Sequence, residues 1–299
     1  MIDTSANVNI ALPAQDGAMP VVSAAQPPAT NRLQIDCMLA YEVDAASEFV
    51  FLIHSAIGMG QTLVQENLRI EPPLPFRTYT DERSGNRFLR LQAQAGPLKL
   101  VYRAVVDRAI EPIDVTAAEV PVHDIPDDLL HFLMPTRYCE SDHLRPNAIE
   151  LFGLLPHGYS RVQAICEWVR ANIEYTIGST NATTTAREVF LQRKGVCRDF
   201  AHLALTFCRA LNIPARLVSG YATFAEPPPD FHAVFEAYLG GRWVLFDPTG
   251  MAPLDQVVRL ATGRDAKDVA FATIFGPARM LAMSPEVLLV NRNAVAGGA

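Results

Sequence analysis

The order of the periodic patterns along the chain constrains its fold more than any other feature. Residues 32–108 consist of short β-rich runs that proline and glycine turn signals separate. Apolar residues then recur at helical spacing over residues 126–212, and strand-like runs return after Pro214. Because strands and helices occur in blocks rather than in alternation, we expect an α+β protein and not a parallel α/β sheet.

The same patterns predict a domain organisation. The antiparallel strand spacing favours a small N-terminal β-sandwich domain over residues 32–120, and the Pro-containing stretch EVPVHDIPDD links it to the rest of the chain. Residues 121–292 are expected to form a second domain, with helices packed on an antiparallel β-sheet. Residues 1–31 are rich in Ala, Pro, Ser, Asn and Gln without periodicity, and they are expected to form a disordered tail.

Composition excludes several classes of function. The chain has 299 residues, 49% of them hydrophobic, so it can bury a substantial core. Its net charge of −7 argues against nucleic acid as a partner, and no apolar run is long enough to predict a membrane span. No Lys or Arg precedes Arg32 and no compact apolar run lies near the N-terminus, so we expect no secretory signal and a cytoplasmic protein.

The five cysteines include one that differs from the rest. No CxxC pair occurs, which argues against a disulfide framework or a Cys-rich zinc site. In the stretch QRKGVCRDFAHLALTFCRAL, Cys208 lies on the apolar stripe of the predicted helix, as Cys166 does in its own helix, so both are expected to pack in the core. Cys197 instead follows Gly195 at the helix start, among several cations, and these conditions favour a thiolate.

A hairpin further along the chain offers a base and an orienting group for this thiol. In FHAVFEAYLGGRWVLFDPTG, a two-residue Gly-Gly loop pairs Leu239 with Arg242. This register places Val234 opposite Asp247 and makes His232 the diagonal neighbour of Asp247 on the same face. Diagonal neighbours lie about 7–8 Å apart, within reach of an imidazole and a carboxylate. We therefore expect a hydrogen bond between His232 and Asp247.

Two stretches carry a family resemblance, namely TTTAREVFLQRKGVCRDFAHLALTFCRALNIPARLVSGYA and DFHAVFEAYLGGRWVLFDPTG. They resemble the bacterial transglutaminase-like superfamily, which includes cysteine peptidases with an N-terminal β-domain. The resemblance implies a papain-like core, preceded here by the β-sandwich, and a Cys-His-Asp triad in this chain order. Carried over, Cys197 is the nucleophile, His232 the general base and acid, and Asp247 the group that orients the imidazole.

Three further residues are candidates for the oxyanion site or the substrate pocket. The backbone N–H of Cys197 and the hydroxyl of Tyr175 are possible donors to an oxyanion, although a core position for Tyr175 is an equally good interpretation. Asp199 follows Cys197 closely and favours a helix N-terminus electrostatically. His202 points to a different helical face from its apolar neighbours, and a structural or wall position is favoured for it.

The resemblance implies acyl transfer at an amide carbonyl through a Cys thioester. The leading hypothesis is a cysteine peptidase or amidase that hydrolyses a peptide or isopeptide bond in a peptide or protein substrate. Transglutamination, in which an amine replaces water, is the alternative, and a non-catalytic interaction module on the same fold is a third. The seven histidines are dispersed without metal-ligand spacing, so we expect no metal and no cofactor. The sequence leaves the oligomeric state open.

Overall fold

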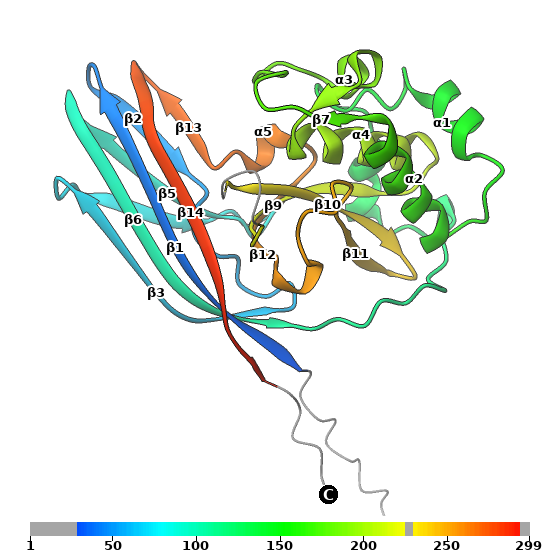
Figure 1. Cartoon of the computed structure of the whole chain (residues 1–299), viewed down its shortest axis with the longest axis horizontal. Coiled ribbons are helices and arrows are strands. Elements are labelled where there is room, and N and C mark those ends of the chain that lie inside the picture. Colours follow the sequence, from blue (N-terminus) through cyan, green and yellow to red (C-terminus); the bar gives the residue numbers. More distant parts are fainter. Residues whose placement is uncertain (1–28, 225–229, 294–299) are drawn as a thin grey trace, which may run out of the picture.

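The computed structural model describes residues 29–224 and 230–293, which form two halves packed against each other (Figure 1). The first half is a β-sandwich of two four-stranded antiparallel sheets, with strand orders β14-β1-β6-β3 and β13-β2-β5-β4. Alternate residues of the long strands are buried, because one face of each sheet packs on the core. Its strands are β1 (Thr30–Val43), β2 (Ser47–Phe51), β3 (Gln61–Glu71), β4 (Phe76–Thr80), β5 (Arg87–Ala93), β6 (Gly96–Ala109), β13 (Ala272–Phe275) and β14 (Ala278–Asn293).

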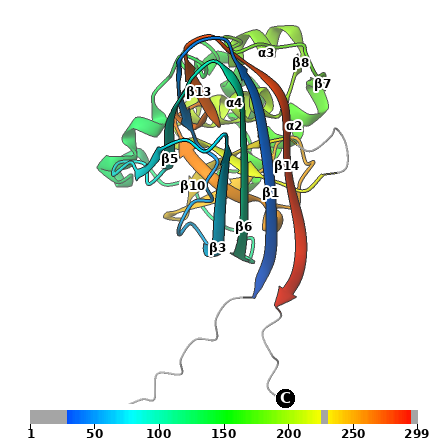
Figure 2. The same cartoon turned by 90° about the vertical axis from the view of Figure 1, so that its left-hand side faces the viewer.

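The last two strands correct the expected domain boundary. β14 pairs antiparallel with β1 along its whole length, and β13 pairs with β2, so both belong to the sandwich (Figure 2). The expectation that residues 121–292 form one separate domain is therefore wrong from β13 onward. Pairing with β14 supplies hydrogen-bond partners to one edge of β1, and no local pattern reveals a pairing across more than 200 residues.

The expected tail, residues 1–31, overlaps only slightly with the described part of the chain. Residues 1–28 lie outside the described residues. Thr30 and Asn31 already belong to β1, where they pair with both β6 and β14, so the strand begins two residues earlier than expected.

The second half combines helices with an antiparallel sheet, as the sequence predicted. The sheet has the order β11-β10-β9-β12. Helix α4 packs on one face of it, and α1, α2 and α3 surround α4 (Figure 1). The elements are η1 (Val122–Asp124), η2 (Asp127–Leu133), α1 (Arg145–Phe152), α2 (Tyr159–Asn172), β7 (Glu174–Tyr175), α3 (Ala186–Gln192), β8 (Lys194–Gly195), α4 (Cys197–Ala210), β9 (Ala215–Tyr221), β10 (His232–Leu239), β11 (Arg242–Phe246), η3 (Leu254–Gln256), β12 (Val258–Gly263) and α5 (Ala266–Val269).

The two halves are joined by buried hydrogen bonds between side chains of one and backbone of the other. The Gln61 amide donates to the Arg259 carbonyl and accepts from the Arg259 N–H, both at 2.9 Å. Asn86 makes the same reciprocal pair with Thr262, at 2.9 and 3.0 Å. Because breaking such a contact leaves buried polar groups unpaired, β12 is held firmly against the sandwich. Among the described residues, no helix has both the length and the apolar character needed to cross a membrane.

Candidate active site

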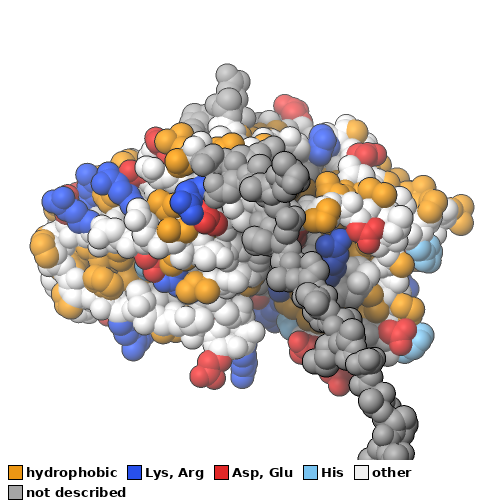
Figure 3. Space-filling model, turned by 90° about the horizontal axis from the view of Figure 1, so that it is seen from below, with side chains coloured by type: hydrophobic (Ala, Val, Ile, Leu, Met, Phe, Trp, Pro, Cys, Tyr) orange, Lys and Arg blue, Asp and Glu red, His pale blue; other side chains and the backbone are white. Residues whose placement is uncertain are grey.

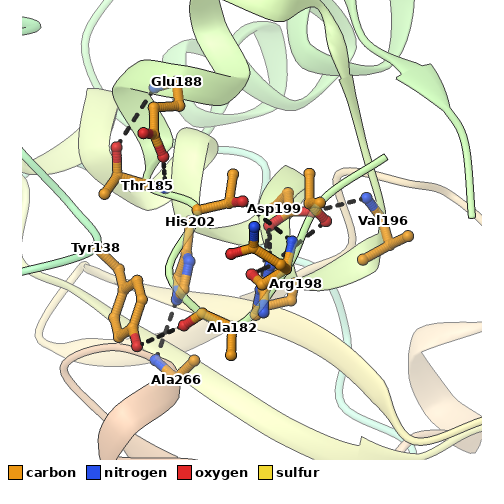
Figure 4. A network of polar contacts seen from close by, with 12 residues as sticks. Tyr138, Ala182, Thr185, Glu188, Val196, Arg198, Asp199, His202 and Ala266 are labelled. Carbon is orange, nitrogen blue, oxygen red and sulfur yellow. Dashed lines mark hydrogen bonds and ion pairs between the residues drawn. The ribbon is translucent and has the colours of Figure 1, made fainter. Parts of the chain in front are cut away.

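The start of α4 is built around a fully buried carboxylate. Asp199 Oδ2 accepts from the Val196 N–H at 2.9 Å and from the Thr180 hydroxyl at 2.6 Å, while Oδ1 accepts from the Arg198 guanidinium at 2.7 Å (Figure 4). A carboxylate at the third helical position that bonds back to the residue before the helix is half of a capping box. It determines where α4 begins, and therefore where Cys197 lies.

Gly195 is required by the same carboxylate. A Cβ atom at this position would lie 2.7 Å from the Cβ of Asp199, closer than two such atoms approach. The glycine before the cysteine is thus explained by the close approach of the buried side chain.

Cys197 is the one cysteine of the five that is partly exposed, and the other four are buried. Cys166 and Cys208 pack in the core, as their helical stripes predicted. The Cys197 sulfur lies 3.9 Å from the carbonyl oxygen of Phe231, the residue before β10. The thiol at the start of α4 therefore faces the start of β10.

The hairpin of β10 and β11 has the register that the Gly-Gly loop predicted. Leu239 lies opposite Arg242, and Phe235 lies opposite Phe246. His232 Nε2 and Asp247 Oδ2 are 3.0 Å apart, and both side chains are buried. The predicted hydrogen bond between the two residues is confirmed.

Asp247 is held by more than the imidazole. Its Oδ1 accepts from the Thr249 N–H at 2.8 Å and from the Thr249 hydroxyl at 2.6 Å, and its Oδ2 also accepts from the Ala252 N–H at 3.1 Å. Burial would raise the pKa of Asp247, but the hydrogen bonds from His232, Thr249 and Ala252 outweigh it and lower the pKa to about 2. Asp247 is therefore ionised at neutral pH.

His232 carries the complementary charge. Burial would lower its pKa, but hydrogen bonds to Asp247 and Cys197, together with their negative charges, raise the pKa to about 9. The imidazole is therefore protonated at neutral pH and lies between the carboxylate and the sulfur. Because Asp247 engages Nε2, Nδ1 is the nitrogen left for the thiol.

Tyr175 lies beside the thiol because β7 and β8 form a short parallel pair that places it opposite Gly195. Burial raises the pKa of Tyr175, and the Cys197 sulfur raises it further. The backbone and the side chain of Cys197 both act on the pKa of the Tyr175 hydroxyl, so the two residues are neighbours. The structure thus brings Tyr175 close to Cys197, while its role as an oxyanion donor stays a prediction.

Asp199 and His202 make structural contacts. The carboxylate of Asp199 is engaged by Thr180, Val196 and Arg198. His202 is fully buried, accepts from the Ala266 N–H at 3.0 Å through Nε2, and stacks on Tyr138 with ring centroids 5.4 Å apart (Figure 4).

Burial and the nearby Arg198 and Arg209 lower the pKa of His202 to about 3, so its ring is neutral. Within the described chain, neither Asp199 nor His202 hydrogen-bonds with the Cys197 thiol or the His232 imidazole. The structure thus supports the structural interpretation of His202 and gives no support to a pocket role for either residue.

Sequence reasoning missed Thr249. The signal was present, because Asp247-Pro248-Thr249 has the spacing of an Asx turn, in which a carboxylate accepts from the N–H two residues on. In the ranges 29–224 and 230–293, no three His, Cys, Asp or Glu side chains are grouped so as to hold a metal ion.

Comparison with known proteins identifies the family of the chain. Residues 149–248 match the family model of the transglutaminase-like superfamily, and residues 31–128 match that of the bacterial transglutaminase N-terminal domain. The crystal structure of a "Putative Cysteine Protease" from Cytophaga hutchinsonii is 41% identical, with a TM-score of 0.85, and the match covers 89% of this chain and 92% of that one.

Curated relatives extend the comparison to shorter regions. An uncharacterised protein of Mycobacterium leprae is 36% identical over 120 residues, which are 36% of this chain and 42% of the relative. One of Mycobacterium tuberculosis is 35% identical over 116 residues, which are 34% of this chain and 37% of the relative. The match thus spans less than half the length of these curated relatives. With its core and its N-terminal half both matched, the chain belongs to the transglutaminase-like superfamily.

Proposed function

We propose that the protein is a cysteine peptidase or amidase that hydrolyses a peptide or isopeptide bond through a thioester. The observation that carries the proposal is the alignment of three side chains. A partly exposed thiol at a helix N-terminus faces an imidazolium, which a buried carboxylate holds at 3.0 Å. An imidazolium beside a thiol favours the thiolate, which is the nucleophilic form.

The chemistry follows from these positions. The Cys197 thiolate attacks the amide carbonyl, and the resulting oxyanion is stabilised by the Cys197 N–H and the Tyr175 hydroxyl, which lie together at the start of α4. His232 gives its proton to the leaving amine, and a thioester to Cys197 remains. His232 then takes a proton from water, which attacks the thioester and releases the acid.

Two measurements test the proposal. Alkylation of the folded protein with iodoacetamide should label Cys197 far faster than the four buried cysteines, and Cys197→Ala should abolish turnover of a peptide library. Cys208→Ala is the matched control, because it removes a buried thiol from the same helix and should retain activity. Full turnover by Cys197→Ala would refute the proposal.

The reaction products show whether water or an amine accepts the acyl group. Acid and free amine released in the absence of added amine would support hydrolysis. If product forms only when a primary amine is added, the enzyme is a transglutaminase. If neither reaction occurs and no thioester is trapped, the fold serves as an interaction module.

A further inference from the structure

A cavity of about 880 Å³ lies between the sandwich and the outer face of the second sheet. Its walls come from both halves: the turn between β4 and β5 with β2 on one side, and β9, β11, β12, η2 and α5 on the other. Its volume is within the range of ligand-binding cavities, and such cavities form preferentially where domains meet.

This interdomain cavity is separate from the candidate active site. Arg216 lines the cavity at the start of β9, whereas Gly220, near the end of that strand, lies opposite His232. On the helix side, Cys197 begins α4, while Arg209 at its far end donates to the Arg264 carbonyl beneath the cavity. A 14-residue helix is about 20 Å long, so the thiol and the cavity lie a helix length apart.

The cations that line the cavity differ in their pairing. Arg264 is paired with Asp268 at 2.9 Å, and Arg216 with the buried Glu236 at 2.7 Å. Arg83 on the sandwich wall and Lys267 on the α5 wall form no ion pair with any carboxylate in the described part of the chain. These two cations line the walls of the two halves, and their charges act on Asp81 and Asp268 without forming an ion pair.

The carboxylates of the cavity do not pair with these two cations. Asp268 forms an ion pair with Arg264. Asp81 accepts hydrogen bonds from the Ser84 N–H at 2.9 Å and from the Ser84 hydroxyl at 2.6 Å, within its own turn. Asp128, at the start of η2, is the third carboxylate on the wall.

A buried cation, Arg209, lies below the cavity, and the charge of the buried Asp265 acts on it. The Arg209 guanidinium donates only to backbone carbonyls, those of Ala215, Arg264 and Met134. Burial, Arg264 and Arg209 lower the pKa of His131 on the cavity wall, against the opposing effect of Asp128. The chain has a net charge of −7, and its two halves carry surface charges of both signs (Figure 3).

The cavity also has an aromatic and aliphatic wall. Trp243 packs edge-on against Phe132 at 5.3 Å, and the Arg216 guanidinium lies 4.2 Å from the Trp243 ring centroid. Phe88 and Leu129 complete this wall from the two halves. The cavity therefore offers a ligand both cations and apolar surface.

We propose that the interdomain cavity is a docking site for an acidic peptide segment with interspersed apolar side chains. The carboxylates of the peptide bind Arg83 and Lys267 on the two walls. The apolar side chains of the peptide pack on Trp243, Phe132 and Phe88. The assignment of the ligand as a peptide rests on the proposed function, since a peptidase would hold its substrate here, remote from the bond that is cleaved. Binding itself does not depend on Cys197.

The test uses the full chain with Cys197→Ala, so that no peptide is consumed. Fluorescence polarisation measures binding of a labelled peptide of Glu, Leu and Phe residues, of the same peptide with Gln for Glu, and of free glutamate as a competitor. Arg83→Ala and Lys267→Ala should each weaken binding of the acidic peptide at least fivefold. Lys99→Ala and Arg279→Ala, which remove exposed cations outside the cavity, should change it less than twofold.

The outcomes separate the two proposals. Equal binding of the Glu and Gln peptides, or equal losses in the cavity and control variants, would overturn the docking site. Competition by free glutamate at the concentration of the peptide would also overturn it, because a small carboxylate would then be sufficient. In the catalytically intact chain, Arg83→Ala should raise KM for long acidic substrates at constant kcat. Binding without any turnover would refute the proposed function and leave the docking site standing.

Discussion

Replacing Asp247 with Asn tests how the carboxylate controls the imidazole. In the native protein, Asp247 oxygens meet only donors: His232 Nε2, the N–H and hydroxyl of Thr249, and the Ala252 N–H. An Asn side chain of the same shape presents one oxygen and one NH2. If the NH2 faces His232, Nε2 must be unprotonated, and the proton moves to Nδ1, on the side of the thiol.

The size of the effect follows from the pKa of His232. The carboxylate and the thiol together raise this pKa from 6.5 to about 9 against the effect of burial. If Asp247→Asn returns it to 6.5 or below, the imidazolium loses on the order of 3 kcal/mol of stabilisation, since tenfold in proton affinity is about 1.4 kcal/mol. The rate of thioester formation at neutral pH should fall roughly 10²- to 10³-fold.

The assay is the alkylation rate of Cys197 between pH 5 and 10, with peptide turnover measured alongside. Wild-type protein should react readily near neutral pH, and Asp247→Asn should react only at higher pH. Thr249→Val is the control, because it removes one hydrogen bond to Asp247 but keeps the charge, and it should lose less than tenfold. A variant Asp247→Asn that keeps the wild-type pH profile would refute the reasoning.

Three further predictions concern stability. Asp199→Ala leaves the Val196 N–H and the Arg198 guanidinium without their buried acceptor. The free energy of unfolding measured in urea should therefore fall by about 3 kcal/mol. An unchanged urea midpoint would contradict the role of Asp199 as a helix cap. The raised pKa of His232 stabilises the folded state fully below pH 6.5, and this contribution is lost as the pH rises through about 9. In His232→Gln, the free energy of unfolding should therefore change less with pH over this range. If the wild type and the variant show the same dependence on pH, His232 does not make this contribution. Deletion of residues 278–299 removes β14 and should abolish cooperative thermal unfolding of the sandwich, whereas a melting temperature close to that of the full chain would show that β1 needs no partner on this edge.

Local chemistry made the hairpin that carries His232 and Asp247 predictable. A Gly-Gly loop permits the positive φ values that a tight hairpin needs, 57° at Gly240 and 79° at Gly241, and the loop determines every pair along β10 and β11. The hydrogen bond between His232 and Asp247 follows from that register. In the same way, the glycine before Cys197 and the helical stripe behind it located the start of α4.

Non-local contacts were beyond the sequence patterns. The run that forms β14 reads as a strand, but nothing in it specifies β1 as its partner. The patterns also do not indicate β12, whose position depends on Gln61 and Asn86 in the sandwich. From the sequence, Asp199 was expected to interact favourably with the helix N-terminus. Its full burial depends on hydrogen bonds from Thr180 and Arg198, which the sequence pattern does not indicate.

The pairing of β1 with β14 has a consequence for how the chain is made. A polypeptide leaves the ribosome from its N-terminus, and domains that are contiguous in sequence can fold as they emerge. Here β1 is synthesised early, but its partner emerges only after the entire second half, including Cys197, His232 and Asp247. The sandwich can therefore be completed only after β14 is translated, when Cys197, His232 and Asp247 have already been synthesised.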